Sequence, residues 1–312
     1  MLYVYPDYYP EFSCIASRCR HSCCIGWEID IDPDSLARYQ AVHGPMGQRL
    51  KACISDGEAP HFILGRDERC PFLNEENLCD LILYGGEDFI CQICTDHPRF
   101  RNFLPGRTEI GVGLCCAAAA HLIRTRKEAV QLVLSGEEAE GEEGKNLLAL
   151  RRHALEIAQD RTKSISQREE KLLEEFQGWI PELPPTQWAA FYLGLERMDE
   201  TWTEHLENLR THGTALDLAA FEVDMADRQT EYEQLLVYFL YRHFLTAWED
   251  GDPGSKVSFA VLSVRFLRLL GALHWQTHGE FTLKDQEEFA RLYSAEVEYS
   301  QENLDFLFDS LM

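Results

Sequence analysis

The stretch Cys14–Cys24, CIASRCRHSCC, decides what kind of fold the chain is expected to have. It places four cysteines within eleven residues, at positions 14, 19, 23 and 24. Thiolates are soft ligands that hold zinc or the irons of an iron–sulfur cluster, and a chain usually brings them together from short local clusters separated by loops. The stretch therefore predicts a region folded around a metal centre.

Further cysteines follow at positions 70, 79, 91, 94, 115 and 116. Pro71 and the segment 74–77 predict a turn that lets the sulfurs of Cys70 and Cys79 point into one site. Structural zinc prefers two Cys-x2-Cys pairs, and this chain has one, at 91–94. The adjacent cysteines at 23–24 suit a larger cluster better than one small ion, which favours iron–sulfur and leaves zinc open.

Composition limits the partners and the compartment. The 312 residues are 45% hydrophobic, enough for one large domain or two moderate ones. The formal net charge of −24 repels phosphate, so we expect no nucleic-acid partner and weak attraction to anionic membranes, whereas a lysine-bearing partner would be attracted. In a reducing compartment, 11 cysteines are better explained as metal ligands and buried thiols than as disulfides.

The sequence also predicts a cytoplasmic protein without membrane insertion. The N-terminal residues MLYVYPDYYPEF lack the basic and apolar regions of a secretory signal. The longest apolar segment near the C-terminus is interrupted by Arg265, Arg268 and His274, so we expect no membrane span.

The predicted fold is mainly α. A cysteine-rich metal-binding region with short strands covers 1–135, the acidic run GEEAEGEEG forms a linker at 136–144, and a helical bundle covers 145–312. Strands are predicted at 27–32 and 108–114, and Asp32 is predicted to cap a helix that starts at Pro33. The other predicted helices are 46–54, 115–134, 145–160, 165–178, 186–209, 215–248, 256–277 and 283–310.

Three sequence motifs resemble the flagellin lysine-N-methylase family and, more broadly, cysteine-rich zinc- or iron-chelating domains. The first runs from Phe12 through Cys23-Cys24-x-Gly-Trp27-x-Ile-x-Ile-Asp32, the second is Cys70-Pro-Phe-Leu with Leu-Cys79-Asp-Leu, and the third is Cys94 with Pro98-Arg99. They cover about the first third of the chain. The segment 116–122 departs from the family's Cys-Pro-Glu-Ala-Ala-Arg-Leu at three positions, and 298–303 is only weakly similar to its closing helix.

The resemblance implies transfer of a methyl group from S-adenosylmethionine to lysine side chains of flagellin, with an iron–sulfur cluster of the 4Fe-4S type. Carried over by motif, the candidate metal ligands are Cys14, Cys19, Cys23, Cys24, Cys70, Cys79, Cys94 and Cys116. These eight candidates are more than the four ligands that one cluster needs. Cys53, Cys91 and Cys115 fall outside the motifs, and we interpret them as small buried hydrophobes.

Methyl transfer to lysine needs a group that guides the amine. A lysine ammonium has no lone pair and must lose a proton before it attacks a sulfonium methyl. Tyr84, Asp88, Asp96 and His97 lie near the cysteines in sequence and are candidates for this role. Each could equally be an ordinary polar or hydrogen-bonding residue.

Two residues of the motifs are candidates for contacting the cofactor. Trp27 and Arg99 match the family pattern, although Trp27 could shield the metal site and Arg99 could pair with a carboxylate. The chain has no glycine-rich nucleotide fingerprint. A non-enzymatic metal-binding interaction module and a redox protein therefore remain alternatives to the methyltransferase.

Overall fold

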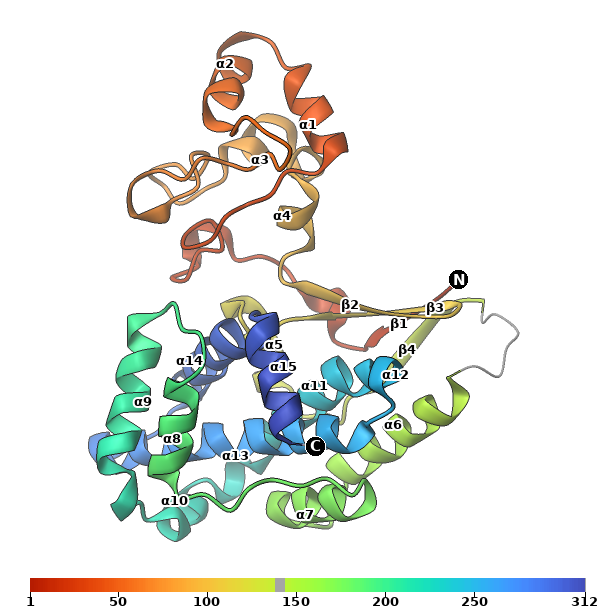
Figure 1. Ribbon diagram of the computed structural model, residues 1–312, viewed down its shortest axis with the longest axis vertical. Helices are drawn as coiled ribbons and strands as arrows, with labels where there is room; N and C mark the ends of the chain where they lie inside the picture. Colours follow the sequence, from red (N-terminus) through yellow and green to blue (C-terminus); the bar gives the residue numbers. More distant parts are fainter. Residues whose placement is uncertain (138–143, 312) are drawn as a thin grey trace. The chain divides into compact units, whose positions relative to one another are not determined.

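A computed structural model describes residues 1–137 and 144–311. The described chain forms two compact units: unit 1 is residues 1–12 with 101–312, and unit 2 is residues 13–100. The fold is mainly α with one small sheet, as predicted (Figure 1). The division differs from the predicted one because the sheet joins residues 2–6 to residues 107–112 and 132–136, which assigns all three segments to unit 1. Most of the predicted linker, 138–143, lies outside the described residues.

The sheet has four strands in the order β2-β3-β1-β4. Their bounds are β1 Leu2–Pro6, β2 Arg99–Leu104, β3 Arg107–Val112 and β4 Leu132–Gly136. β1 runs parallel to β3 and antiparallel to β4, with Val4 opposite Glu109 and Leu134. β3 confirms the strand expected at 108–114. The helix expected over 115–134 is wrong beyond Thr125, because Val133 and its neighbours pair with β1 instead.

The rest of unit 1 is helical. Its helices are α5 Ala117–Thr125, α6 Lys145–Ala158, α7 Ile165–Glu175, α8 Pro185–Leu193, α9 Glu200–His212, α10 Leu218–Asp224, α11 Gln229–His243, α12 Ala247–Asp250, α13 Pro253–His278, α14 Leu283–Tyr293 and α15 Gln301–Ser310. Three predicted helices are divided. The break in 186–209 comes at Gly194, 215–248 becomes three helices, and the π-helix Ser294–Glu298 interrupts 283–310.

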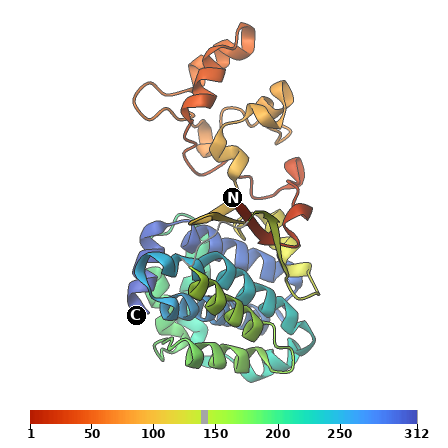
Figure 2. The same ribbon diagram turned by 90° about the vertical axis from the view of Figure 1, so that its right-hand side faces the viewer.

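Helices α11 and α13 form the centre of unit 1 and pack against each other (Figure 2). Asp252 caps α13 by accepting from the backbone N–H groups of Gly254 and Ser255, and Gly279 ends the helix with φ 83°. Tyr241 of α11 donates to the carbonyls of Val4 and Ile110, so the sheet packs against the helices. The apolar surface of both helices is buried almost all round, which is typical of central core helices.

Helix α13 is also the helix among the described residues that has the length and composition to cross a membrane. Its most apolar 18 residues have a mean hydropathy of 1.5. Arg265, Arg268 and His274 therefore do not disqualify it, contrary to the sequence expectation. Since 78% of that window is buried inside the protein, the core role accounts for its composition.

Unit 2 has short helices joined by long loops. The helices are α1 Pro33–Gln40, α2 Gly44–Cys53, α3 Asp80–Gly85 and α4 Gln92–Asp96. The strand predicted at 27–32 is wrong: this segment forms an isolated bridge between Asp30 and His61. Its alternation still has a structural basis, because Ile29 and Ile31 both point into the core of unit 2.

Candidate metal centre and a buried polar network

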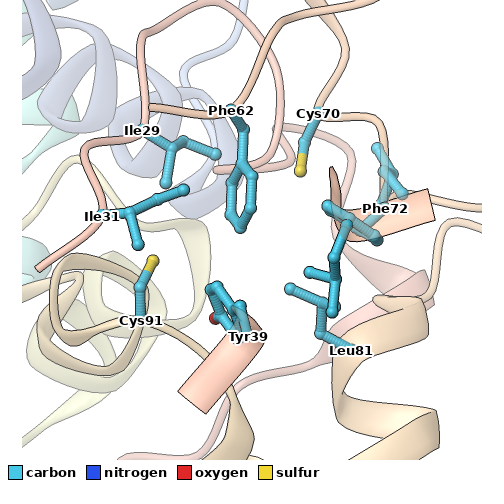
Figure 3. Close-up of a cluster of buried hydrophobic side chains, with 10 residues drawn as sticks. Ile29, Ile31, Tyr39, Phe62, Cys70, Phe72, Leu81 and Cys91 are labelled. Atoms are coloured by element: carbon cyan, nitrogen blue, oxygen red, sulfur yellow. The ribbon is translucent and has the colours of Figure 1, made fainter. Parts of the chain in front are cut away.

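Six cysteines of unit 2 share one apolar core. Cys70 and Cys91 are buried within it, and Cys24, Cys53, Cys79 and Cys94 pack against it. Figure 3 shows the sulfurs of Cys70 and Cys91 pointing into the space that the apolar side chains of this core surround. We call the five without Cys53 the thiol cluster: Cys24, Cys70, Cys79, Cys91 and Cys94.

Backbone contacts bring three of these thiols together, those of Cys24, Cys70 and Cys79. The N–H of Cys70 donates to the carbonyl of Cys24 at 2.8 Å, and an isolated bridge pairs Leu73 with Cys79. Between them, the Asn74 side chain accepts from the backbone N–H of Leu78 at 2.9 Å, which closes the turn predicted there. The turn places Cys70 and Cys79 on the same core, as the sequence predicted.

The other two thiols come from α4. Cys91 precedes the helix and Cys94 lies in its first turn, with the two Sγ atoms 3.4 Å apart. Asp32 holds this helix, because its carboxylate accepts from the backbone N–H of Gln92 at 2.8 Å and from that of Ser35 at 2.9 Å. The prediction that Asp32 is a cap is confirmed, and the residue caps two helices.

The surroundings keep most of these thiols neutral. Burial raises the pKa of Cys70 to about 12 and also raises the pKa of Cys79. The hydrogen bond between Cys91 and Cys94 lowers the pKa of the first and raises that of the second. A hydrogen bond with Cys23 lowers the pKa of Cys24 to about 7. A metal cation would supply the positive charge that such thiols need to ionise together.

Tyr39 gives a second indication that a thiolate-bound group fits this core. Tyr39 belongs to the same core as these thiols, and burial and then the charges of Cys91 and Cys94 raise its pKa. Its hydroxyl is buried and has no hydrogen-bond partner in the described parts of the chain. A buried hydroxyl without a partner costs free energy, and a sulfur-rich group at this position could accept its hydrogen bond. By chemistry alone, the thiols of this core suit an iron–sulfur cluster or zinc.

The remaining candidate ligands lie elsewhere. Cys14 and Cys23 are exposed and Cys19 is half-buried, all on the loop before Trp27. Cys116 belongs to unit 1. Within residues 1–137 and 144–311, no group of three or more His, Cys, Asp or Glu side chains is arranged so that it could hold a metal ion.

The three cysteines outside the motifs have different surroundings. Cys53 is half-buried against the unit 2 core, as a small apolar residue would be. Cys91 is fully buried, yet its contact with Cys94 makes it as well placed for a metal as its neighbour. Cys115 is half-buried in unit 1, where burial raises its pKa to about 12 despite a hydrogen bond with Tyr299.

The candidates for guiding the amine are spread over unit 2. Tyr84 is 54% exposed at the end of α3 and contacts Phe89, with ring centroids 5.4 Å apart. Asp88 lies in the short turn just before Phe89. The carboxylate of Asp96, on α4, accepts from the side chain of Gln92 at 2.8 Å. These three residues thus belong to three different elements, each with its own local contacts.

Trp27 and His97 are brought together. Their ring centroids are 5.9 Å apart, and the indole N–H of Trp27 donates to the carbonyl of Cys23 at 2.6 Å. Burial lowers the pKa of His97 to about 4, so the imidazole is neutral at pH 7. Arg99 donates to the carbonyl of Thr95 at 3.0 Å. These contacts connect the motif around Trp27 to the end of α4.

Unit 1 contains a buried polar network that the sequence analysis missed. The carboxylate of Glu298 lies 2.6 Å from Nε2 of His243 and accepts from the hydroxyl of Tyr238 at 3.0 Å. Arg242 donates to the same hydroxyl at 2.7 Å, and its guanidinium lies 4.8 Å from the ring centroid of Tyr299. The network joins α11 to the π-helix Ser294–Glu298, a rare element that is frequent at functional sites.

Electrostatics fix the charges of this network. Burial opposes ionisation of Glu298, but the charge of Arg242 and the hydrogen bond from His243 hold its pKa below the usual value. Burial lowers the pKa of His243. A neutral His243 that donates from Nε2 to an ionised Glu298 satisfies both shifts.

The network also contacts the segment before α5. The N–H of Leu114 donates to the hydroxyl of Tyr238 at 3.2 Å, and a Cβ on Gly113 would lie 2.4 Å from the hydroxyl of Tyr299. Any larger residue at this position would force the side chain of Tyr299 to move. The two segments that resembled the family least clearly, 116–122 and 298–303, therefore begin beside one another in unit 1.

One signal could have revealed the network. Tyr238 and Arg242 are four residues apart on the helix that the sequence predicted at 215–248. Polar residues inside an otherwise apolar helix need buried partners, and Glu298 in a distant segment supplies them. The pairing itself depends on the fold.

Comparison with known proteins identifies the family. Residues 151–312 match the family described as the FliB lysine N-methylase C-terminal domain, which is half of the chain and includes the helical part of the network. The chain belongs to this family. The resemblance inferred from the cysteine motifs is therefore confirmed by a separate part of the chain.

Curated relatives agree with the family at low identity. The chain is 24% identical over 141 residues to the lysine-N-methylase of Salmonella typhimurium, covering 41% of this chain and 33% of that protein. It is 23% identical over 137 residues to the flagellar biosynthetic protein FliU of Salmonella muenchen, covering 41% of this chain and 79% of that protein. The alignment thus spans about a third of the Salmonella typhimurium methylase. No solved structure matches this chain.

Proposed function

We propose that the protein transfers methyl groups from S-adenosylmethionine to lysine side chains of a protein substrate, with flagellin as the first candidate. The observation that carries the proposal is the family match over residues 151–312. The names of the curated relatives support the same activity and the flagellar context. The net charge of −24 favours a substrate that presents lysines.

The reaction is a displacement at carbon. The lysine Nζ loses a proton to a base, and its lone pair attacks the sulfonium methyl group. The new N–C bond forms as the C–S bond breaks, and that electron pair stays on sulfur in S-adenosylhomocysteine. The amine must therefore be desolvated or hydrogen-bonded so that the neutral form is accessible.

Residues near the thiol cluster remain our candidates for guiding the amine. His97 is neutral at pH 7 and lies against Trp27, so it can accept a hydrogen bond beside an aromatic face. With a pKa of about 4 it is suited to orienting the amine and poorly suited to retaining its proton. Tyr84 and Asp96 are the other candidates, and Trp27 and Arg99 remain candidates for contacting the cofactor.

The thiol cluster is our proposed site for an iron–sulfur cluster, with 4Fe-4S as the expected type and zinc as the alternative. Cys24, Cys70, Cys79, Cys91 and Cys94 share one core, one more than four ligands require. An iron–sulfur cluster would supply redox-active iron and a fixed scaffold for unit 2. Cys14, Cys19 and Cys23 remain candidates on the adjacent loop, and Cys116 remains one in unit 1.

The first experiment is to purify the full chain without oxygen and measure iron, zinc, acid-labile sulfide and the electronic spectrum. S-adenosylmethionine binding and transfer of a labelled methyl group to flagellin are then measured on the same sample. Iron, sulfide, cofactor binding and labelled lysine together support the enzyme. Stoichiometric zinc without cofactor binding contradicts it and favours a non-enzymatic metal-binding module.

A further inference from the structure

A cavity in the helical part of unit 1 lies outside the thiol cluster and the buried network. Its volume is about 610 Å³, which is in the range of small-ligand sites. Helices α7, α8, α10 and α13 and the segment 180–183 line it. All of these elements lie within the residues that match the family.

The walls of the cavity are largely apolar. Trp188, Phe221 and Phe266 are buried residues that line it, and Leu183 and Leu218 line it nearer the solvent. Such a surface suits an aliphatic chain or a long side chain with a polar end. Apolar walls alone do not identify an occupant, but the charges at the same cavity do.

Both arginines of the lining are already paired. Arg265 donates to the carboxylate of Glu169 at 2.8 Å, and Arg268 donates to the other oxygen of that carboxylate at 3.1 Å. Arg268 also pairs with Glu222. Because Glu169 is 1% exposed and holds both guanidinium groups, the two arginines are poorly available to an incoming anion.

Two glutamates of the lining are left over. The lining has four glutamates and two arginines, so its formal net charge is −2. Glu170 and Glu182 are exposed, and neither forms an ion pair within the part of the chain that the structure describes. The cavity therefore combines apolar walls with uncompensated negative charge where it meets solvent.

We infer that this cavity binds a lysine-bearing segment of the protein substrate. The apolar walls would contact the four methylene groups of a lysine, and Glu170 and Glu182 would face its ammonium. Anionic ligands are disfavoured by the same carboxylates. The identification of the bound segment as methylation substrate rests on the proposed function, whereas the binding itself does not.

The test measures binding of short peptides to the full chain without S-adenosylmethionine. One peptide carries a single central lysine, and its match carries norleucine, which keeps the aliphatic chain and lacks the charge. We expect the lysine peptide to bind about fivefold more tightly, as two exposed ion pairs would give. The double variant Glu170→Gln/Glu182→Gln should remove this preference and leave norleucine binding unchanged.

Two further variants keep the test specific. Glu249→Gln/Glu280→Gln removes the same charge from exposed positions outside the lining, and should leave the lysine preference intact. Leu218→Trp adds bulk at the partly exposed edge of the cavity and should weaken both peptides. Equal loss in the two glutamate pairs would show that net charge alone attracts the peptide, and would overturn the inference.

The inference and the proposed activity can fail separately. A lysine preference that depends on Glu170 and Glu182, with no methyl transfer to any lysine, supports the binding site and contradicts the enzyme. Methyl transfer with the same KM for flagellin in wild type and in Glu170→Gln/Glu182→Gln supports the enzyme and overturns the binding site. Equal binding of lysine and norleucine peptides also overturns it.

Discussion

The two units bury polar groups in opposite ways. Unit 1 buries charged side chains on long helices and pairs them, as Glu233 shows by accepting from Arg161 and from Arg168. Unit 2 buries thiols on loops and short helices, and the hydroxyl of Tyr39 beside them has no partner in the described chain. Unit 1 also leaves buried polar atoms without a partner in the described chain, among them the hydroxyl of Tyr232. What distinguishes unit 2 is that its unpartnered tyrosine hydroxyl belongs to a core that also holds thiols.

This difference suggests where each unit gains its stability. A buried ion pair with good geometry is balanced by its own protein partners, and removing one partner leaves an uncompensated charge. Thiols in an apolar core have no such partners, and metal binding can supply folding free energy to a loop-rich region. We therefore expect unit 2 to respond to metal and unit 1 to respond to changes in its ion pairs.

The largest expected effect is loss of metal from the thiol cluster. In Cys70→Ala/Cys94→Ala we expect the metal content of purified protein to fall by about tenfold or more, because two ligands of one site are removed. Elemental analysis measures the metal, and limited proteolysis should show new cleavage between residues 13 and 100. Cys53→Ala is the matched control, since Cys53 packs against the same core. Full metal content in the double variant would contradict the assignment of the cluster.

A smaller but substantial effect is expected in the buried network of unit 1. Glu298→Ala leaves Arg242 buried without its carboxylate partner, so we expect a loss of about 3–5 kcal/mol in the free energy of unfolding. Urea unfolding followed by far-UV circular dichroism measures this loss. Glu280→Ala changes an exposed glutamate and should stay within about 0.5 kcal/mol of wild type. Similar losses in both variants would show that the network does not stabilise unit 1.

The comparison also shows what the sequence could predict. The turn at 74–78 places Cys70 and Cys79 on one core, as expected. The metal centre that the cysteine spacing indicated stays a prediction. Short-range signals such as the Asp32 cap were also correct, because they depend on residues close in sequence.

Long-range pairing explains most of what was missed. Residues 126–134 have a helical pattern, yet β4 forms because it pairs with β1, which lies far from it near the N-terminus. Cys91 was interpreted as a buried hydrophobe, but in the fold its sulfur lies beside that of Cys94. The link between Tyr238 and Glu298 spans 60 residues, and no local pattern predicts it.

The pH dependence of unfolding gives a sharper view of the network. His243 has a folded pKa below 6.5, so the unfolded chain binds more protons, and we expect unit 1 to lose stability as pH falls below about 6.5. Glu298 has a folded pKa below 4.5, so its contribution is present above that value and is lost at lower pH. A tenfold difference in proton affinity between the folded and unfolded states changes the free energy of unfolding by about 1.4 kcal/mol.

The measurement is the free energy of unfolding of the full chain at several pH values between 8 and 5, where Glu298 stays ionised. His243→Gln keeps a side-chain donor and removes the titration, so its stability should vary less with pH than that of wild type over this interval. An identical pH profile in the two proteins would assign the dependence to other groups.

The smallest expected effects come from helix caps. A cap in each unit allows the most direct comparison of the two units. Ser164 caps α7 by accepting from the N–H of Gln167, so Ser164→Ala should cost about 1 kcal/mol and leave the metal content unchanged. Asp32 accepts from the N–H groups of both Ser35 and Gln92, so Asp32→Ala should cost about 1–2 kcal/mol. Because Gln92 begins the helix that carries Cys94, this variant should also release metal to a chelator faster than wild type does. Equal chelation rates in the two variants would mean that the thiol cluster does not depend on the position of α4, and the contrast between the units would then lie in their side chains alone.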